Sequence, residues 1–322
     1  MDYQLTPANN PIMPAYFQGR WTVKTIRETP VMYTTNLGAE FWFQVKGASY
    51  VTIALMNLTP ISSWIAIQID GLPYQRLAVA TLPYRLTLDG QPHLIRVVMS
   101  GNTDEDQVWT QPVGFAVQPL QTDGQLTAVK PGRHSLTFIG DSITAGCWVA
   151  GHQPAEDYRG EANYAAIASD LLNARNVRIG YSAIGLTKPG TGGVPTLPEV
   201  LTAIDSQTAW QPIPTDVVVI NVGTNDGLAG ADGFTAAFKL FLNQVQRLYP
   251  NSRIAVLVPF NQRFDRVIRT VVPEFVQLDL IETADWQPTT TDQVHLDVAG
   301  SQSAGQQLAV ALKTLYPEVF KA

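Results

Sequence analysis

One short stretch near the middle of the chain restricts the fold more than any other part of the sequence. Residues 136–139 read Leu-Thr-Phe-Ile, a mostly apolar run that predicts a buried strand. The run ends at Gly140, and Asp141, Ser142 and Thr144 follow. Such a strand can hold a hydroxyl at the carboxyl edge of a sheet, where open α/β sheets bind their ligands. Gly, Asp and Ser are also ordinary turn residues, so this stretch alone leaves a plain turn as an equal alternative.

From residue 128 onward the pattern alternates between strand and helix, which is typical of an α/β domain. The expected strands are 136–139, 177–181, 216–222, 253–258 and 276–280. The expected helices are 163–174, 197–204, 232–249, 264–271 and 298–315. Strands as apolar as residues 217–220 (Val-Val-Val-Ile) indicate a parallel sheet covered on both faces.

Polar residues follow four of these strands. Ser142 follows the first, the segment 182–185 the second, Asn225 the third, and a loop with Asp292 and His295 the fifth. The carboxyl ends of parallel strands meet at one edge of a sheet, so these groups fall on the same edge. A chance scatter of turn residues would occupy both edges equally. The agreement therefore favours a catalytic site over a set of plain turns.

The first part of the chain, residues 1–127, is rich in β-type segments. Candidate strands are 40–45, 50–55, 64–69, 85–88, 93–99 and 115–120. Turn signals occur at Asp70-Gly71 and Asp89-Gly90. Short strands at regular spacing predict a β-sandwich. We interpret His93, which lies among strand residues, as structural, and the segment 121–133 as the connector between two domains.

Composition excludes several classes of function. The chain of 322 residues has a net charge of −6 and no Lys/Arg run, so nucleic acid and anionic membranes are not expected partners. The start shows no signal peptide and no apolar run is long enough to span a bilayer. Together with a single cysteine, Cys147, these features favour a cytoplasmic location. No His/Cys/carboxylate cluster has metal-ligand spacing, so we expect no metal.

The residues at the predicted sheet edge suit nucleophilic catalysis. A serine hydroxyl such as that of Ser142 needs an adjacent base, and His295 is the best of four histidines. Asp292 lies three residues before it and can orient the imidazole. The Ser142 and Gly185 backbone N–H groups and the Asn225 amide are candidate oxyanion donors. The competing interpretations are a helix-cap or surface role for His295 and a turn role for Asn225.

Two tryptophans, the single cysteine and a glycine-rich segment each allow a functional and a structural interpretation. Trp148 and Trp286 border the predicted site and could stack on a sugar ring, although ordinary packing is equally consistent. Cys147 has no evident base, so we interpret it as a packed residue. The glycine-rich segment 190–193 lacks the strand-to-helix context of a dinucleotide site, and we read it as a loop lining the cleft. We therefore expect no cofactor.

These motifs resemble the blocks of the SGNH (GDSL-type) hydrolase superfamily. The residues that carry the resemblance are Gly140-Asp141-Ser142-Ile143-Thr144-x-Gly146, Gly185, Gly223-Thr224-Asn225-Asp226 and Asp292-Gln293-Val294-His295. The resemblance implies Ser142 as nucleophile, His295 as base and Asp292 as its orienter. It also implies an oxyanion hole formed by Ser142, Gly185 and Asn225. A β-rich domain before such a catalytic domain is similar to the second carbohydrate esterase family.

We therefore expect a β-sandwich (jelly-roll) domain over 1–127. A flavodoxin-like α/β/α domain with a five-stranded parallel sheet should follow over 128–322. The expected function is a serine esterase that removes short acyl groups, acetyl above all, from carbohydrates. The expected partner is a small-molecule or oligosaccharide acyl ester. The alternatives are a lipid-type esterase or thioesterase, and a carbohydrate-binding protein with an inactive hydrolase fold.

Overall fold

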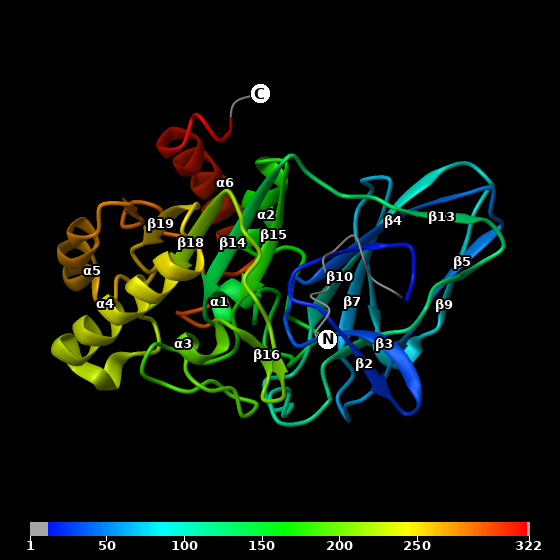
Figure 1. Cartoon of the computed structure of the whole chain (residues 1–322), viewed down its shortest axis with the longest axis horizontal. Helices are drawn as coiled ribbons and strands as arrows, with labels where there is room; N and C mark the ends of the chain where they lie inside the picture. The colour runs from blue at the N-terminus through cyan, green and yellow to red at the C-terminus, as the bar shows by residue number, and fades with distance from the viewer. Residues whose placement is uncertain (1–11, 321–322) are drawn as a thin grey trace.

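A β-sandwich and an α/β domain lie side by side in the computed structural model, which describes residues 12–320 (Figure 1). The largest sheet of the sandwich has the order β1-β4-β10-β7-β8, with β13 also paired to β4. Its strands are β1 (Tyr16–Gln18), β4 (Glu40–Lys46), β7 (Trp64–Ile69), β8 (Gln75–Ala78), β10 (His93–Gly101) and β13 (Gln125–Ala128). The antiparallel pairing and the apolar inner face, which includes Phe41, Phe43 and Val97, confirm the jelly-roll prediction.

Two smaller antiparallel sheets complete the sandwich. One has the order β2-β3-β11-β6 and the other the order β12-β5-β9. Their strands are β2 (Thr22–Ile26), β3 (Thr29–Thr34), β5 (Tyr50–Ile53), β6 (Leu55–Met56), β9 (Tyr84–Thr87), β11 (Phe115–Val117) and β12 (Gln121–Thr122). The predicted strand 50–55 is therefore split at Ala54 between two sheets. A short 3-10 helix, η1 (Val79–Thr81), connects β8 to β9.

The predicted connector 121–133 is wrong in its first half. β12 pairs with β5, and β13 pairs with β4 in a register that places Gln125 opposite Lys46. These pairings join segments far apart in sequence, which local composition cannot reveal. The predicted domain division at 127/128 falls at the end of β13. The first eleven residues of the predicted sandwich domain lie outside the described part of the chain.

The second domain is built on a parallel sheet of five strands within the described residues, in the order β15-β14-β18-β19-β20. The strands are β14 (His134–Gly140), β15 (Ala174–Ile179), β18 (Val217–Asn221), β19 (Arg253–Leu257) and β20 (Leu278–Ile281). Numbered within the domain this order is 2-1-3-4-5, which is the flavodoxin-like topology. The predicted fold of this domain is confirmed.

Helices cover both faces of this sheet, as the continuous apolar strands require. In β18, Val217 and Val219 face one core, whereas Val218 and Ile220 face the other. α2 (Tyr164–Leu171) and α6 (Val298–Leu315) pack on the first face. α3 (Leu197–Val200), α4 (Gly230–Leu248) and α5 (Asp265–Val271) pack on the second. Two 3-10 helices, η2 (Gly227–Ala229) and η3 (Val272–Glu274), adjoin α4 and α5.

One predicted helix is shorter than expected and is followed by a pair of short strands. The helix expected over 197–204 ends at Val200, and Ala203–Asp205 forms β16, which pairs with β17 (Thr208–Ala209). The reason is tertiary: the carbonyls of Val200 and Ala203 both accept hydrogen bonds from the buried guanidinium of Arg20 in the sandwich. Because these two carbonyls bind Arg20, they do not accept the backbone hydrogen bonds that would continue the helix.

The two domains share a packed interface. Val108 and Trp109, from the segment that follows β10, are buried in the core of the α/β domain, and the Trp109 ring lies edge-on to Tyr181 at 6.0 Å. The backbone N–H of Trp109 donates to the carbonyl of Gly192 at 3.2 Å. The glycine-rich segment 190–193 therefore contacts the segment that joins β10 to β11, and its role as a loop lining the cleft stays a prediction.

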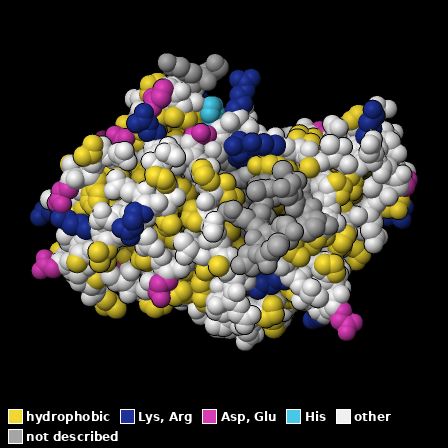
Figure 2. Space-filling model, in the orientation of Figure 1, with side chains coloured by type: hydrophobic (Ala, Val, Ile, Leu, Met, Phe, Trp, Pro, Cys, Tyr) yellow, Lys and Arg dark blue, Asp and Glu magenta, His cyan; other side chains and the backbone are white. Residues whose placement is uncertain are grey.

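The surface shows no gathering of basic side chains on the face in Figure 2, where Lys and Arg are scattered among polar and apolar groups. Among the helices of residues 12–320, none has the length and apolar character needed to cross a membrane.

Candidate active site

Ser142 lies at the start of α1 (Ser142–Ala145), directly beyond the carboxyl end of β14. Asp141 caps this short helix, and its side chain accepts from the Ile143 N–H at 2.9 Å. Gly146 ends the helix at a left-handed φ of 99°, which a glycine adopts without strain. This strand, cap and short helix place the hydroxyl at the sheet edge, as the sequence predicted.

A buried polar network supports the nucleophile turn from below. The Asn163 amide donates to the carbonyls of Ile143 and Thr144 at 3.2 and 2.6 Å. The Asn163 side-chain oxygen in turn accepts from the guanidinium of Arg178 at 3.0 Å. Desolvation by burial lowers the pKa of Arg178 to about 10. These contacts fix the turn from α2 and β15 and were not foreseen from the sequence, because they join residues that share no local motif.

The structure brings the three predicted catalytic side chains together. His295 Nε2 lies 2.8 Å from Ser142 Oγ, and His295 Nδ1 lies 2.7 Å from Asp292 Oδ2. Both distances are in the hydrogen-bond range. Ser142 and His295 are separated by 153 positions, so only the fold makes this contact. A serine, an imidazole and a carboxylate in this order form the arrangement that activates a hydroxyl for acyl transfer.

The Asp-x-x-His spacing works through both carboxylate oxygens of Asp292. One oxygen, Oδ1, accepts from the backbone N–H groups of Val294 and His295 at 3.1 and 2.8 Å, while Oδ2 faces the imidazole. Partial burial opposes ionisation, but these hydrogen bonds outweigh it and hold the pKa of Asp292 below its ordinary value. The carboxylate therefore stays ionised and can stabilise an imidazolium.

The candidate oxyanion donors differ in their present partners. The Asn225 amide donates to the carbonyl of Ile184 at 2.9 Å, which fixes its orientation and leaves its second hydrogen for another acceptor. The Gly185 N–H, in contrast, donates to the carbonyl of Lys188 at 2.9 Å. A side chain at Gly185 would meet the Asp226 carboxyl at 2.7 Å. Close packing against Asp226 therefore explains why position 185 is a glycine. Its N–H is already hydrogen-bonded to Lys188 in the same loop.

Asp226 is a site residue to which sequence reasoning gave no role. It is 1% exposed, and its Oδ1 accepts from both the N–H and the hydroxyl of Thr187 at 2.8 Å. It thereby ties the loop after β15 to the turn after β18. The sequence signal that could have identified Asp226 is its position directly after Asn225 in the motif Gly-Thr-Asn-Asp.

Of the two tryptophans, Trp148 packs at the edge of the sandwich core, with its ring edge-on to Tyr158 at 4.8 Å. Trp286 lies 6.2 Å from Phe260, which lies 5.3 Å from Tyr164, and the Tyr164 hydroxyl is 2.7 Å from that of Thr144. The structure thus links Trp286 to the nucleophile turn by an aromatic chain. It gives Trp148 a packing role, and sugar stacking by either residue stays a prediction.

Cys147 does not have the surroundings of a reactive nucleophile. Cys147 is 3% exposed, and burial raises the pKa of its thiol well above the ordinary value, which agrees with a packed residue rather than a nucleophile. Desolvation also raises the pKa of the buried Asp141 to about 6. In the described part of the chain, no group of three His, Cys, Asp or Glu residues could hold a metal ion.

A flavodoxin-like sheet with a Ser-His-Asp arrangement at its carboxyl edge defines a serine-hydrolase type of protein. The profile of the GDSL-like lipase/acylhydrolase family matches residues 138–302, about half of the chain. The chain belongs to this family.

Relatives extend the likeness to both domains. The cellulase/esterase CelE of Acetivibrio thermocellus is 29% identical over 211 residues, which cover 60% of this chain and 25% of that protein. The chain thus spans about a quarter of this relative. A family two carbohydrate esterase from Clostridium thermocellum, solved with cellohexaose, aligns with a TM-score of 0.77 at 22% identity over 94% of this chain and 99% of its own. An acetyl xylan esterase from Butyrivibrio proteoclasticus aligns with a TM-score of 0.73 at 18% identity over 94% and 96%.

Proposed function

We propose that the protein is a serine esterase that removes short acyl groups, acetyl first, from carbohydrates. The observation that supports this most directly is the hydrogen-bonded series Ser142, His295 and Asp292. The names of the relatives, a cellulase/esterase and an acetyl xylan esterase, supply the substrate class and the acyl group.

In the proposed reaction, Ser142 Oγ attacks the ester carbonyl while His295 Nε2 takes the hydroxyl proton. The resulting imidazolium is stabilised by Asp292. The tetrahedral intermediate collapses, the bond to the sugar oxygen breaks, and His295 returns the proton to that oxygen. Water then attacks the acyl-enzyme with His295 again as base, which releases the carboxylic acid and restores the Ser142 hydroxyl.

The oxyanion of both intermediates needs donors at the same edge. We assign the Ser142 N–H and the second hydrogen of the Asn225 amide. For the third donor, Ala183 is a better candidate than Gly185. Ala183 has a left-handed φ of 59° in the loop after β15, which ends at Ile179, and within residues 12–320 its N–H has no hydrogen-bond partner.

The test is the hydrolysis of p-nitrophenyl acetate by the wild type, Ser142→Ala and Cys147→Ala. We expect Ser142→Ala to lose at least about 10³-fold in kcat, because the nucleophile is removed, and Cys147→Ala to stay close to the wild type. Equal rates for the wild type and Ser142→Ala would contradict the proposal. Folding of both variants is checked by circular dichroism.

A series of acyl chain lengths separates the alternatives. Faster turnover of octanoyl than acetyl esters would favour a lipid-type esterase or thioesterase. Sugar binding without any ester hydrolysis would favour a carbohydrate-binding protein on an inactive hydrolase fold. Acetate release from acetylated saccharides identifies the sugar.

A further inference from the structure

The loop after β19 places a guanidinium against the turn that carries Asn225. Arg263 Nη1 lies 3.3 Å from the carbonyl oxygen of Thr224, the residue before Asn225. A side chain on Gly227 would overlap Arg263 Nη1, so the glycine makes room for the guanidinium. β19 is a neighbour of β18 in the parallel sheet, so this loop emerges at the same edge as Ser142.

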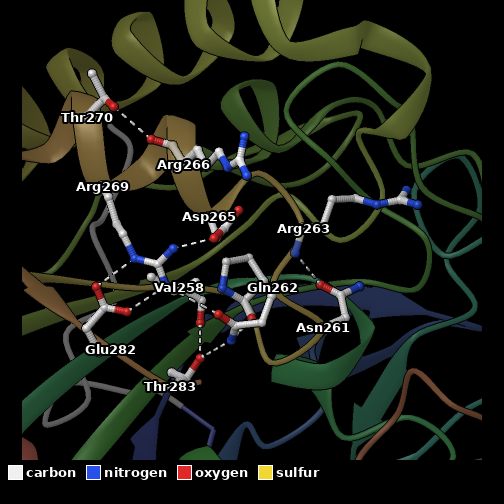
Figure 3. Close-up of polar contacts among 11 residues, drawn as sticks. Val258, Asn261, Gln262, Arg263, Asp265, Arg266, Arg269, Thr270, Glu282 and Thr283 are labelled. Atoms are coloured by element: carbon white, nitrogen blue, oxygen red, sulfur yellow. Dashed lines mark hydrogen bonds and ion pairs between the residues drawn. The ribbon is translucent and has the colours of Figure 1, made fainter. Parts of the chain in front are cut away.

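The backbone on both sides of Arg263 is held in place by specific contacts. Gln262 and Phe264 both have a φ of 57°, which is uncommon for residues other than glycine. The Gln262 amide donates to the Pro259 carbonyl at 3.1 Å and to the Thr283 hydroxyl at 2.9 Å (Figure 3). The Phe264 ring stacks on Phe234 at 4.1 Å. These contacts fix the loop, so the position of Arg263 is set by the fold.

Arg263 forms no ion pair with any residue in the part of the chain that the structure describes, 12–320. Its neighbour Arg269 pairs with Asp265 and Glu282, and the Arg263 side chain extends away from that cluster (Figure 3). In the described residues, Arg263 has no carboxylate partner and its side chain is exposed. One carbonyl uses only part of the five N–H donors of a guanidinium. The remaining donors are open in a protein whose net charge is −6.

We propose that Arg263 binds a carboxylate on the substrate, so that the preferred ester is an acylated uronic acid. A guanidinium presents a planar pair of donors that matches a carboxylate. Arg263 lies beside the turn that carries the oxyanion donor Asn225. Its guanidinium is therefore placed to bind a carboxylate on the sugar, which is the alcohol part of the ester. The proposal rests on the proposed esterase function.

The test compares two small esters that differ only at C6: methyl glucuronoside and methyl glucoside, each with one acetyl group at the same position. For the wild type we expect kcat/KM to be at least about tenfold higher for the glucuronoside, mainly through KM. Arg263→Gln should abolish this preference, while Arg263→Lys should keep part of it. Any loss that Arg263→Gln shows on the glucoside and on p-nitrophenyl acetate should be much smaller than its loss on the glucuronoside.

The matched control is Arg266→Gln, which removes the same charge from an exposed arginine three residues further along the chain. It should retain the preference for the glucuronoside. The proposal is overturned if the wild type shows no preference, or if Arg263→Gln slows all three esters equally, because the guanidinium then only supports the turn.

If the wild type hydrolyses none of the esters, the esterase proposal fails, and calorimetry with unacetylated methyl glucuronoside decides the carboxylate site. Binding that Arg263→Gln removes would support the site, and the absence of binding to the wild type would reject it.

Discussion

At the scale of single residues, Asp292 has two roles: it stabilises its own loop and it orients the catalytic imidazole. Its Oδ1 shapes the loop by accepting two backbone N–H groups, and its Oδ2 orients the imidazole of His295. These contacts all lie within residues 292–295, so the pair is defined by the local sequence spacing. The nucleophile must be supplied by the fold, since it follows β14, an interior strand of the sheet that lies between β15 and β18.

Replacing Asp292 with Asn should reduce kcat by about 10²–10⁴-fold with little change in KM. An amide can donate to His295 Nδ1, which favours the tautomer that keeps the proton on Nε2 and cannot accept from Ser142. The measurement is steady-state hydrolysis of p-nitrophenyl acetate, with Asp285→Asn in the preceding exposed segment as the control. A variant that retained most of the wild-type kcat would show that Asp292 only shapes the loop.

The site residues differ in how far sequence could predict them. Ser142, Asp292 and His295 lie in compact motifs whose chemistry is readable from residue type and spacing. The role assigned to Gly185 is not supported by the present geometry, because the same glycine signal arises from packing against Asp226. Arg263 carries no motif at all, and its significance depends on which turn the fold places beside it.

At the scale of secondary-structure elements, prediction succeeded where the pattern is local and failed where pairing is distant. The helix α4 was expected at 232–249, because its aromatic residues recur on one face that packs on the sheet. β13 and β16 were missed, since their strand character comes from β4 and from the contact with Arg20. The predicted structural role of His93 agrees with its contacts, because its ring joins two turns.

His93 lies between two turns of the sandwich, the one that joins β7 to β8 and the one that joins β9 to β10. Its Nδ1 is 2.7 Å from Asp70 and its Nε2 is 2.9 Å from Asp89. Hydrogen bonds to both carboxylates raise the pKa of His93 above its ordinary value. A raised histidine pKa means that the folded state binds the proton more tightly than the unfolded chain. This stabilisation is present below the unfolded value of about 6.5 and is lost as the pH rises through the folded value.

We therefore expect His93→Gln to lower the thermal midpoint more at about pH 6 than at about pH 9. The effect should be small, because both carboxylates are largely exposed and screened by solvent. Thermal unfolding of both proteins at the two pH values measures it, and His152→Gln at an exposed position is the control. If the difference in thermal midpoint between the two proteins does not change with pH, protonated His93 does not stabilise the fold through Asp70 and Asp89.

At the scale of the whole molecule, the two domains are joined by a polar contact that is closed to solvent. Arg20 is 0% exposed, and desolvation by burial lowers its pKa. Its guanidinium donates to Asn36 at 2.7 Å within the sandwich. Across the interface it donates to Tyr181, Val200 and Ala203 at 2.6 Å. Nearby, Lys24 forms an ion pair with Asp205. These contacts hold the segment 200–205 and fix the two domains relative to each other.

Replacing Arg20 with Met should destabilise the two-domain chain by about 3 kcal/mol, because methionine fills part of the space but leaves buried carbonyls without donors. Differential scanning calorimetry of the whole chain should show a lower midpoint. It should also show a broadened or divided transition, if docking couples the unfolding of the two domains. Arg133→Met, at an exposed position, should melt like the wild type. Wild-type melting of Arg20→Met would show that the apolar contacts of Val108 and Trp109 suffice to hold the domains together.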